Sequence, residues 1–257
     1  MSELKKIIAT GKGGVEKTTT LTTLSLLWAR EGKKVIVFDT DPSMNLALSY
    51  GIPYDSMATI TEDKADISEN LEENGIDEVG QDILNDHSAV TEDGVRIVIM
   101  GAIEHGGDGC LCSAISVIKL LLDYVEKTGE YDIAIVDSQA GPEILGRGLA
   151  ASFDCNVVLS EPTSKSSEVS RQVKKLAEDL GIKDTVLIVN KADAESDVSF
   201  TAQMVGVEPY KAVGVFYDRD VVKADKEGLL LVDAFPESVA LGNLKNAKAL
   251  LEKCIGW

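Results

Sequence analysis

The sequence predicts one α/β domain in which helices cover both faces of a mostly parallel sheet. Short β-rich runs alternate with longer helical runs along the chain, which is the pattern of repeated strand–helix–strand units. The strand candidates are apolar throughout, as at residues 35–38, and parallel strands buried on both faces have this composition. The chain shows no internal repeat, low-complexity tract or linker, so residues 1–257 are expected to form a single domain.

The elements follow in chain order. We expect strands at residues 6–10, 35–38, 95–100, 133–136, 156–159, 185–189 and 212–216 because each is short and β-rich. Between them lie helices at about 18–31, ended by Gly32, at 113–127 and at 167–180. A last helix at roughly 237–254 closes the chain. Residues 53–93 are acid-rich and weakly periodic, so short helices and loops are expected there, at an edge of the domain.

The charge balance restricts the partners. The chain has 43 acidic and 25 basic residues, a net charge of −18, which repels nucleic-acid backbones and anionic membranes. No run approaches the ~20 apolar residues needed to span a bilayer, and the N-terminus leads directly into a strand rather than a signal peptide. We therefore expect a cytoplasmic protein that binds neither nucleic acid nor membrane, with four cysteines that serve as thiols or metal ligands.

A glycine-rich turn between the first strand and the first helix is the strongest signal. Glycines let backbone N–H groups surround phosphate oxygens, and the helix N-terminus adds its positive end. Lys17 would reach the β- and γ-phosphates, and the Thr18 hydroxyl would ligate Mg²⁺. The alternative is a glycine-rich turn without a ligand. The predicted nucleotide-binding residues in this segment are Gly11, Gly13, Gly14, Val15, Lys17, Thr18 and Thr19.

This turn resembles the deviant Walker A motif of the MinD, ParA, nitrogenase-iron-protein and CooC superfamily of P-loop NTPases, because it has an early lysine, Lys12. The resemblance implies an ATPase that forms a homodimer around ATP, with Lys12 reaching the nucleotide of the other subunit. Glu16 departs from the pattern, since the superfamily has glycine there. A carboxylate close to the phosphates should weaken ATP binding or turnover. Three explanations of Glu16 are open: it is an engineered substitution, it marks a natural variant that binds nucleotide poorly, or the loop turns its side chain outward.

Polar residues at three strand ends complete the predicted ATP site. Asp39 and Asp41 follow residues 35–38, and Asp137 follows residues 133–136, where open α/β sheets bind ligands. The resemblance implies that Asp137 holds Mg²⁺ through water, that Asp39 lies near the metal and that Asp41 positions the attacking water. Asn190 and Lys191 follow residues 185–189, and Asn190 resembles the residue that reads adenine. Residues 216–228 resemble the last nucleotide-proximal loop and helix of the superfamily.

Cys110 and Cys112 lie one residue apart and could bind the same soft metal ion. Two thiolates are half of a four-sulfur site, which a symmetric dimer completes by repeating the pair. Two free thiols at a helix start are the alternative. The motif resembles the CooC-type ATPases, which implies that the pair binds Ni²⁺ or Zn²⁺ and that the protein inserts nickel into a client carbon monoxide dehydrogenase or acetyl-CoA synthase. Glu104, His105 and Asp108 could extend the site.

The sequence therefore predicts a homodimeric metallochaperone ATPase, whose hydrolysis Glu16 impairs, and leaves two alternatives open. One is an ATPase like the nitrogenase iron protein, in which the cysteines of two subunits hold an iron–sulfur cluster. The other is a positioning or switch ATPase like MinD or ParA, although the net charge of −18 conflicts with DNA segregation. Cys155 and Cys254 are expected to be core or surface thiols.

Overall fold

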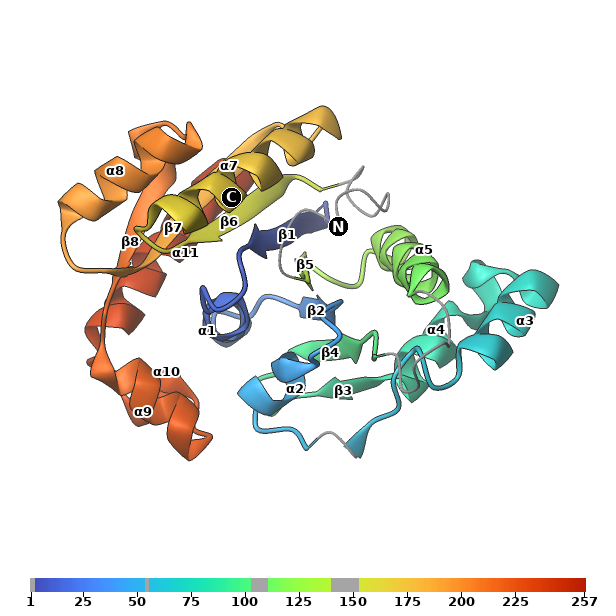
Figure 1. Ribbon diagram of the computed structural model, residues 1–257. Coiled ribbons are helices and arrows are strands. Elements are labelled where there is room, and N and C mark those ends of the chain that lie inside the picture. Colours follow the sequence, from blue (N-terminus) through green and yellow to red (C-terminus); the bar gives the residue numbers. More distant parts are fainter. Residues whose placement is uncertain (1–2, 54–55, 103–110, 140–152) are drawn as a thin grey trace.

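The computed structural model describes residues 3–53, 56–102, 111–139 and 153–257, and they form an α/β domain around one sheet (Figure 1). Among the described strands, the first two neighbours in this sheet are antiparallel and every other pair is parallel. The predicted fold class is confirmed. The strand order is β3 (Ser88–Val90), β4 (Arg96–Ile99), β2 (Val35–Asp39), β5 (Ile133–Asp137), β1 (Lys5–Gly11), β6 (Cys155–Ser160), β7 (Asp184–Ala192) and β8 (Ala212–Phe216).

Two hydrophobic cores lie on opposite faces of the sheet because the strands are apolar on both sides. In β2, Ile36 and Phe38 belong to one core, whereas Val35 and Val37 belong to the other. The first core packs against α3 (Lys64–Asn74), α4 (Ile76–Asp86), α5 (Cys112–Thr128), α7 (Ser164–Asp179) and α8 (Glu195–Val205). The second packs against α1 (Lys17–Arg30), α2 (Asn45–Ser49), α9 (Arg219–Glu227), α10 (Leu231–Ala234) and α11 (Val239–Ile255).

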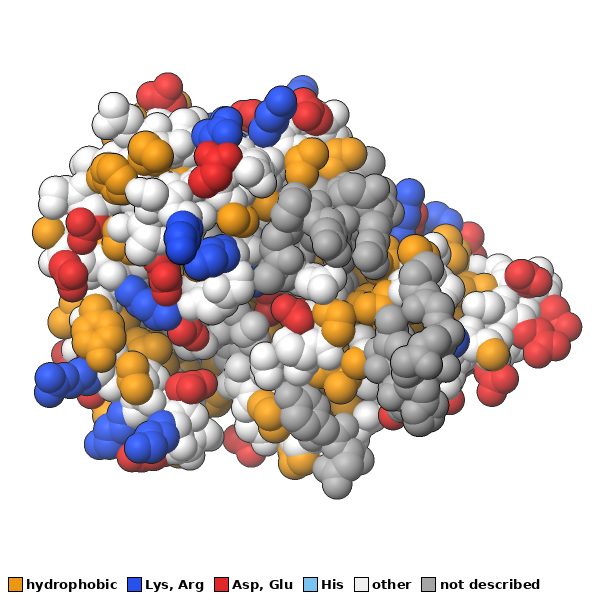
Figure 2. All heavy atoms as spheres, in the orientation of Figure 1, with side chains coloured by type: hydrophobic (Ala, Val, Ile, Leu, Met, Phe, Trp, Pro, Cys, Tyr) orange, Lys and Arg blue, Asp and Glu red, His pale blue; other side chains and the backbone are white. Residues whose placement is uncertain are grey.

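The acid-rich residues 53–93 differ in part from the prediction. They contain α3 and α4, of 11 residues each, and the short strand β3, which was not predicted. β3 has only three residues, Ser-Ala-Val, and they are at least partly exposed, so the sequence carries little β signal there. Exposed acidic side chains gather at the end of the molecule that α3 and α4 form (Figure 2), among them Asp66, Glu69, Glu72, Glu73, Asp77 and Glu78.

A second correction concerns β7, which continues through Asn190 and Lys191 instead of ending before them. The extension pairs with β8, so it depends on a contact that no local pattern reveals. None of the described helices is long and apolar enough to cross a membrane.

The parallel strands bring their carboxyl ends to one edge of the sheet. Gly11 ends β1, Asp39 ends β2 and Asp137 ends β5. Asp39 and Asp137 are direct partners in the register of β2 and β5, and Ala9 of β1 is the partner of Asp137 on the other side. This edge therefore places the glycine-rich turn next to two carboxylates.

Candidate functional site

The glycine-rich turn between β1 and α1 begins at Gly11, which lies against the backbone of β6. Gly11 has a φ of 151°, and a Cβ built there would lie 2.3 Å from the carbonyl oxygen of Leu159. Only glycine fits a backbone approach this close. Gly14 has a φ of 81°, and α1 begins at Lys17. The first N–H groups of α1 have no partners within the helix, so they are available to an anion at this turn.

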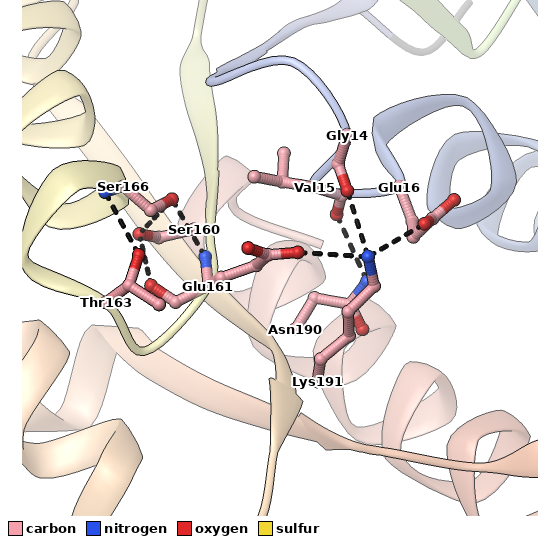
Figure 3. Close-up of polar contacts among 9 residues, drawn as sticks. All are labelled: Gly14, Val15, Glu16, Ser160, Glu161, Thr163, Ser166, Asn190 and Lys191. Atoms are coloured by element: carbon pink, nitrogen blue, oxygen red, sulfur yellow. Dashed lines mark hydrogen bonds and ion pairs between the residues drawn. The ribbon is translucent and has the colours of Figure 1, made fainter.

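β7 supports the same turn through a β-bulge. The register with β8 shifts between Asn190 and Ala192, and Lys191 has a positive φ of 55°. Both side chains point to the turn (Figure 3): Asn190 Nδ2 donates to the Val15 carbonyl oxygen at 3.1 Å, and Lys191 Nζ donates to that of Gly14 at 3.0 Å. Two predicted nucleotide-binding residues thus hold the backbone of the turn, while contact of Asn190 with a base stays a prediction.

Glu16 occupies the left-handed region, with φ 62° and ψ 43°, immediately before α1. This conformation costs a residue with a side chain about 1–2 kcal/mol, which explains why glycine is expected at this position. The Glu16 carboxylate lies 2.9 Å from Lys191 Nζ, and Glu161 lies at the same distance on the other side (Figure 3). Burial lowers the pKa of Lys191, but the two carboxylates outweigh it and raise that pKa. Lys191 therefore stays charged and offsets Glu16.

The side chain of Glu16 is turned toward Lys191. It is nevertheless part of the lining of the cleft beside the turn, and its side chain is 40% exposed. Ion pairs this exposed are screened by water and contribute about 0–1 kcal/mol. The neutralisation by Lys191 is thus incomplete, and negative charge remains beside the predicted phosphate position.

Asp39 and Asp137 form a buried pair of carboxyl groups with raised pKa values. Burial and then the charge of Asp137 raise the pKa of Asp39. Burial raises the pKa of Asp137 to about 6, although the Lys17 ammonium and the Thr18 hydroxyl act in the opposite direction. Thr18 Oγ1 donates to Asp137 Oδ2 at 2.8 Å, whereas Oδ1 of Asp137 has no hydrogen-bond partner among the described residues.

These residues fit a magnesium ion that binds together with nucleotide phosphates. An unpartnered carboxylate oxygen beside a threonine hydroxyl offers the oxygen ligands that Mg²⁺ requires. A buried carboxyl without a partner also costs free energy, which a cation would offset. Thr18 and Asp137 are therefore suited to hold Mg²⁺, in the roles that the resemblance implies.

Asp41 is held in a fixed orientation between Asp39 and Ser43. Its backbone N–H donates to Asp39 Oδ1 at 2.9 Å. Its own Oδ1 accepts hydrogen bonds from the backbone N–H of Ser43 at 2.9 Å and from the hydroxyl at 2.8 Å. An ionised carboxylate offers about four lone-pair sites, so Asp41 keeps the capacity to accept a hydrogen bond from a water molecule.

A cleft of about 850 Å³ opens beside the turn. One wall consists of the turn, α1 and residues 41–49, and the other consists of α9, α10 and the segment between them. The sequence pointed to residues 216–228 but missed Leu229–Val232, which lie beyond that segment. Lys12, Asn190 and Lys191 are outside the lining of this cleft, and Lys12 is half-buried. The predicted residues in its lining are Gly13, Gly14, Lys17, Thr18, Thr19 and Asp41.

The metal motif lies only partly within the described residues. Cys112 is the first residue of α5 and is exposed. Cys110, together with Glu104, His105 and Asp108, lies outside the described residues, as do Ala140 and Gly141 after Ser138. The described residues contain no group of three or more potential ligands that could hold a metal ion by themselves.

Comparisons with known proteins agree with this geometry. The family described as the CobQ/CobB/MinD/ParA nucleotide binding domain matches residues 6–232. The carbon monoxide dehydrogenase accessory protein CooC of Rhodospirillum rubrum is 31% identical over 90% of this chain and 90% of that protein. An ATP-binding protein of Methanocaldococcus jannaschii is 34% identical over 86% of this chain and 88% of that one. The septum site-determining protein MinD of Pyrococcus horikoshii, solved with Mg-ADP, has a TM-score of 0.75 at 21% identity, covering 98% of both chains.

Replacing Glu16 by glycine should tighten Mg-ATP binding by about tenfold, or about 1.4 kcal/mol. The change removes a charge beside the phosphates and places glycine in a left-handed conformation. Calorimetric titration of wild type, Glu16→Gly and Glu16→Gln measures it, because the glutamine removes only the charge. Equal affinities for wild type and Glu16→Gly would contradict our account. A gain in the glycine variant alone would assign the effect to the backbone.

The raised pKa of Asp137 predicts a pH dependence of the metal-free protein. Asp has a pKa of about 4 in an unfolded chain, against about 6 for Asp137 here. Between these values the folded protein binds more protons, so the free energy of unfolding falls as the pH rises, by about 3 kcal/mol in total. Asp137→Asn should remove this loss and raise the Tm at pH 7.5 by about 5–10 °C without Mg²⁺.

Thermal unfolding between pH 4 and 8 in a chelator tests this expectation, with Asp41→Asn as the control at a partly exposed position. The Asp137 variant should also gain less stability from Mg-ATP than the wild type does. A lower Tm for metal-free Asp137→Asn than for wild type at pH 7.5 would contradict this expectation, because it would show that the buried carboxylate does not lower the free energy of unfolding.

Proposed function

Because this chain belongs to the CobQ/CobB/MinD/ParA nucleotide-binding domain family and is an ATPase of that family, we propose that it is a cytoplasmic metallochaperone. It dimerises with nucleotide, binds Ni²⁺ or Zn²⁺ through Cys110 and Cys112 of each subunit, and inserts nickel into a carbon monoxide dehydrogenase or acetyl-CoA synthase. The observation that carries the proposal is the Cys-x-Cys pair in a chain related to the CooC accessory protein along nearly its whole length.

The ATPase site supports a mechanism of positioning and charge neutralisation. The turn from Gly11 to Thr19 and the Lys17 ammonium would bind the phosphates, and ADP would remain after hydrolysis. Mg²⁺, held by Thr18 and Asp137, would supply positive charge to the phosphate oxygens. Asp41, oriented by Ser43, would accept a hydrogen bond from the attacking water. Lys12 would act in the other subunit, which makes hydrolysis depend on the dimer.

The proposed cargo site depends on the dimer as well. Cys110 and Cys112 supply two thiolates, and a two-fold axis between subunits would bring the second pair to the same ion. The four resulting ligands are sulfur atoms, which suit Zn²⁺ and, under reducing conditions, nickel. A state of the protein that separates the subunits would then release the ion, because each half-site alone holds only two ligands.

The strand arrangement offers a connection between the two sites. The backbone N–H of Met100, the residue after β4, donates to the carbonyl oxygen of Asp39 at 2.9 Å. β4 leads into the segment that carries Cys110, while the Asp39 carboxylate accepts hydrogen bonds from the backbone N–H groups of Asp41 and Leu46. Asp41 is therefore connected through Asp39, by two hydrogen bonds, to the residue that follows β4 and precedes the cysteine segment.

The two alternatives remain distinguishable by their metal content. A pair of Cys-x-Cys motifs across a dimer also suits a four-cysteine iron–sulfur cluster. A positioning or switch ATPase like MinD or ParA would have no metal cargo, and its fold would be the same. The net charge of −18 argues against a role on DNA or on an anionic membrane.

The double substitution Cys110→Ser/Cys112→Ser should remove about one metal ion per dimer, because the dimer then lacks all four thiolates. Elemental analysis and light scattering on reduced protein loaded with Ni²⁺ or Zn²⁺, with and without Mg-nucleotide, measure both quantities. Cys155→Ser/Cys254→Ser is the matched control and should keep its metal. Unchanged metal in the first variant would exclude the bridging site. Iron and sulfide in the wild type would favour a cluster, and a metal-free wild type would favour a switch ATPase.

Mixing two inactive variants tests whether Lys12 acts on the partner's nucleotide. In a mixed dimer of Lys12→Ala and Asp41→Ala, action in trans leaves one complete site, which combines the intact Asp41 of one subunit with the intact Lys12 of the other. Random pairing should restore about a quarter of the wild-type ATPase rate. Each variant alone should be inactive. If the mixture stays as inactive as the separate variants although mixed dimers form, Lys12 acts within its own subunit.

A further inference from the structure

A second pair of cysteines lies away from the nucleotide site, on the opposite side of the sheet from α5. Cys155 is the first residue of β6, and Cys254 is in the last turn of α11, 99 positions later. Their Sγ atoms are 3.7 Å apart. We propose that Cys155 and Cys254 form a redox-active dithiol, which a peroxide converts into a disulfide that links β6 to α11.

The geometry suits such a bond. A disulfide has an S–S distance of about 2.05 Å, so the two sulfur atoms need to approach by only about 1.7 Å. The two sulfur atoms are already joined by a hydrogen bond. The two residues lie on elements of the same core, since Cys155 is a core residue and Cys254 packs against it. A rotation of the two side chains would supply this approach.

The two thiols differ in accessibility and in charge environment. Cys155 is fully buried, whereas Cys254 is partly exposed. The hydrogen bond from Cys155 lowers the pKa of Cys254, with the Lys211 ammonium acting in the same direction and burial and the Asp184 carboxylate opposing. The same hydrogen bond, together with burial, raises the pKa of Cys155. Lys211 is held in place by Asp184, whose Oδ1 lies 2.7 Å from its Nζ.

This difference assigns the order of steps. The accessible Cys254 thiolate attacks hydrogen peroxide, the O–O bond breaks, and a sulfenic acid and hydroxide result. The Cys155 sulfur then attacks the Cys254 sulfur, and the hydroxyl of the sulfenic acid leaves as water with the proton from Cys155. In total, two thiols and one hydrogen peroxide molecule give one disulfide and two water molecules. The buried Cys155 is the resolving thiol.

The bond would fix the helix that packs on the helix of the phosphate turn. Glu252, two residues before Cys254, accepts hydrogen bonds from Trp28 Nε1 of α1 at 3.0 Å and from Lys248 Nζ at 2.7 Å. Lys248 also pairs with Glu31 at the end of α1, at 2.6 Å. The last turns of α11 are thus joined to α1 by polar contacts on one side and to β6 by the two thiols on the other.

Peptide mapping after oxidation tests the proposal, with Cys110→Ser/Cys112→Ser as the background so that the other thiols cannot contribute. The reduced full-length protein is treated with hydrogen peroxide in the presence of glutathione as a reference thiol, and free thiols are then alkylated. We expect a cross-linked peptide pair that contains Cys155 and Cys254, a mass loss of two hydrogens, and a Tm about 10 °C higher because the bond closes a long loop.

Two single variants assign the roles. In Cys155→Ala, oxidation should stop at a Cys254 sulfenic acid, which a 1,3-dione reagent traps. In Cys254→Ser, which changes a partly exposed position, Cys155 should remain a thiol. Circular dichroism confirms that each variant is folded. The proposal is overturned if both thiols are still alkylated after the glutathione is consumed, or if a Cys254 sulfenic acid accumulates while Cys155 is present.

Discussion

The candidate nucleotide site depends on two carboxyl groups, Asp39 and Asp137, that are buried next to each other at matching positions of adjacent strands. Without a cation, this arrangement is unfavourable, because burial and mutual repulsion both oppose ionisation. The surrounding contacts are arranged to tolerate it: Thr18 donates to one carboxylate, and the backbone N–H groups of Asp41 and Leu46 donate to the other. The same contacts connect the phosphate turn, β2 and β5, so whatever neutralises the carboxyl groups acts on all three at once.

Lys191 is the counterpart of these acids on the other side of the phosphate turn. Its three contacts, with Gly14, Glu16 and Glu161, use the three N–H donors of an ammonium group. A chain with glycine in place of Glu16 would have a different balance, since Lys191 would then pair with Glu161 alone. The unusual residue in the turn and the bulge in β7 therefore form one structural feature, in which the bulge aims a cation at the carboxylate.

Local patterns were sufficient for the parts of the structure that are encoded locally. The apolar runs predicted the seven parallel strands, and the glycines and strand-end acids predicted where the site would be. Three features depended on tertiary contacts instead. β3 is visible only as the neighbour of β4, the bulge at Lys191 arises from pairing with β8, and Leu229–Val232 reach the cleft because α9 and α10 fold back toward α1. The backbone contact of Asn190 with Val15 likewise required the folded turn.

Trp28 lies in the helix that begins at the phosphate turn, is fully buried, and donates its indole N–H to Glu252 of α11. The second of the two tryptophans, Trp257, is near the end of the chain, with the Lys33 ammonium 4.1 Å from its ring centre. The emission of an indole responds to charge and hydration around it. The protein therefore carries its own optical probes at the junction between α1 and the C-terminus, and changes transmitted along α1 can be followed in unlabelled protein.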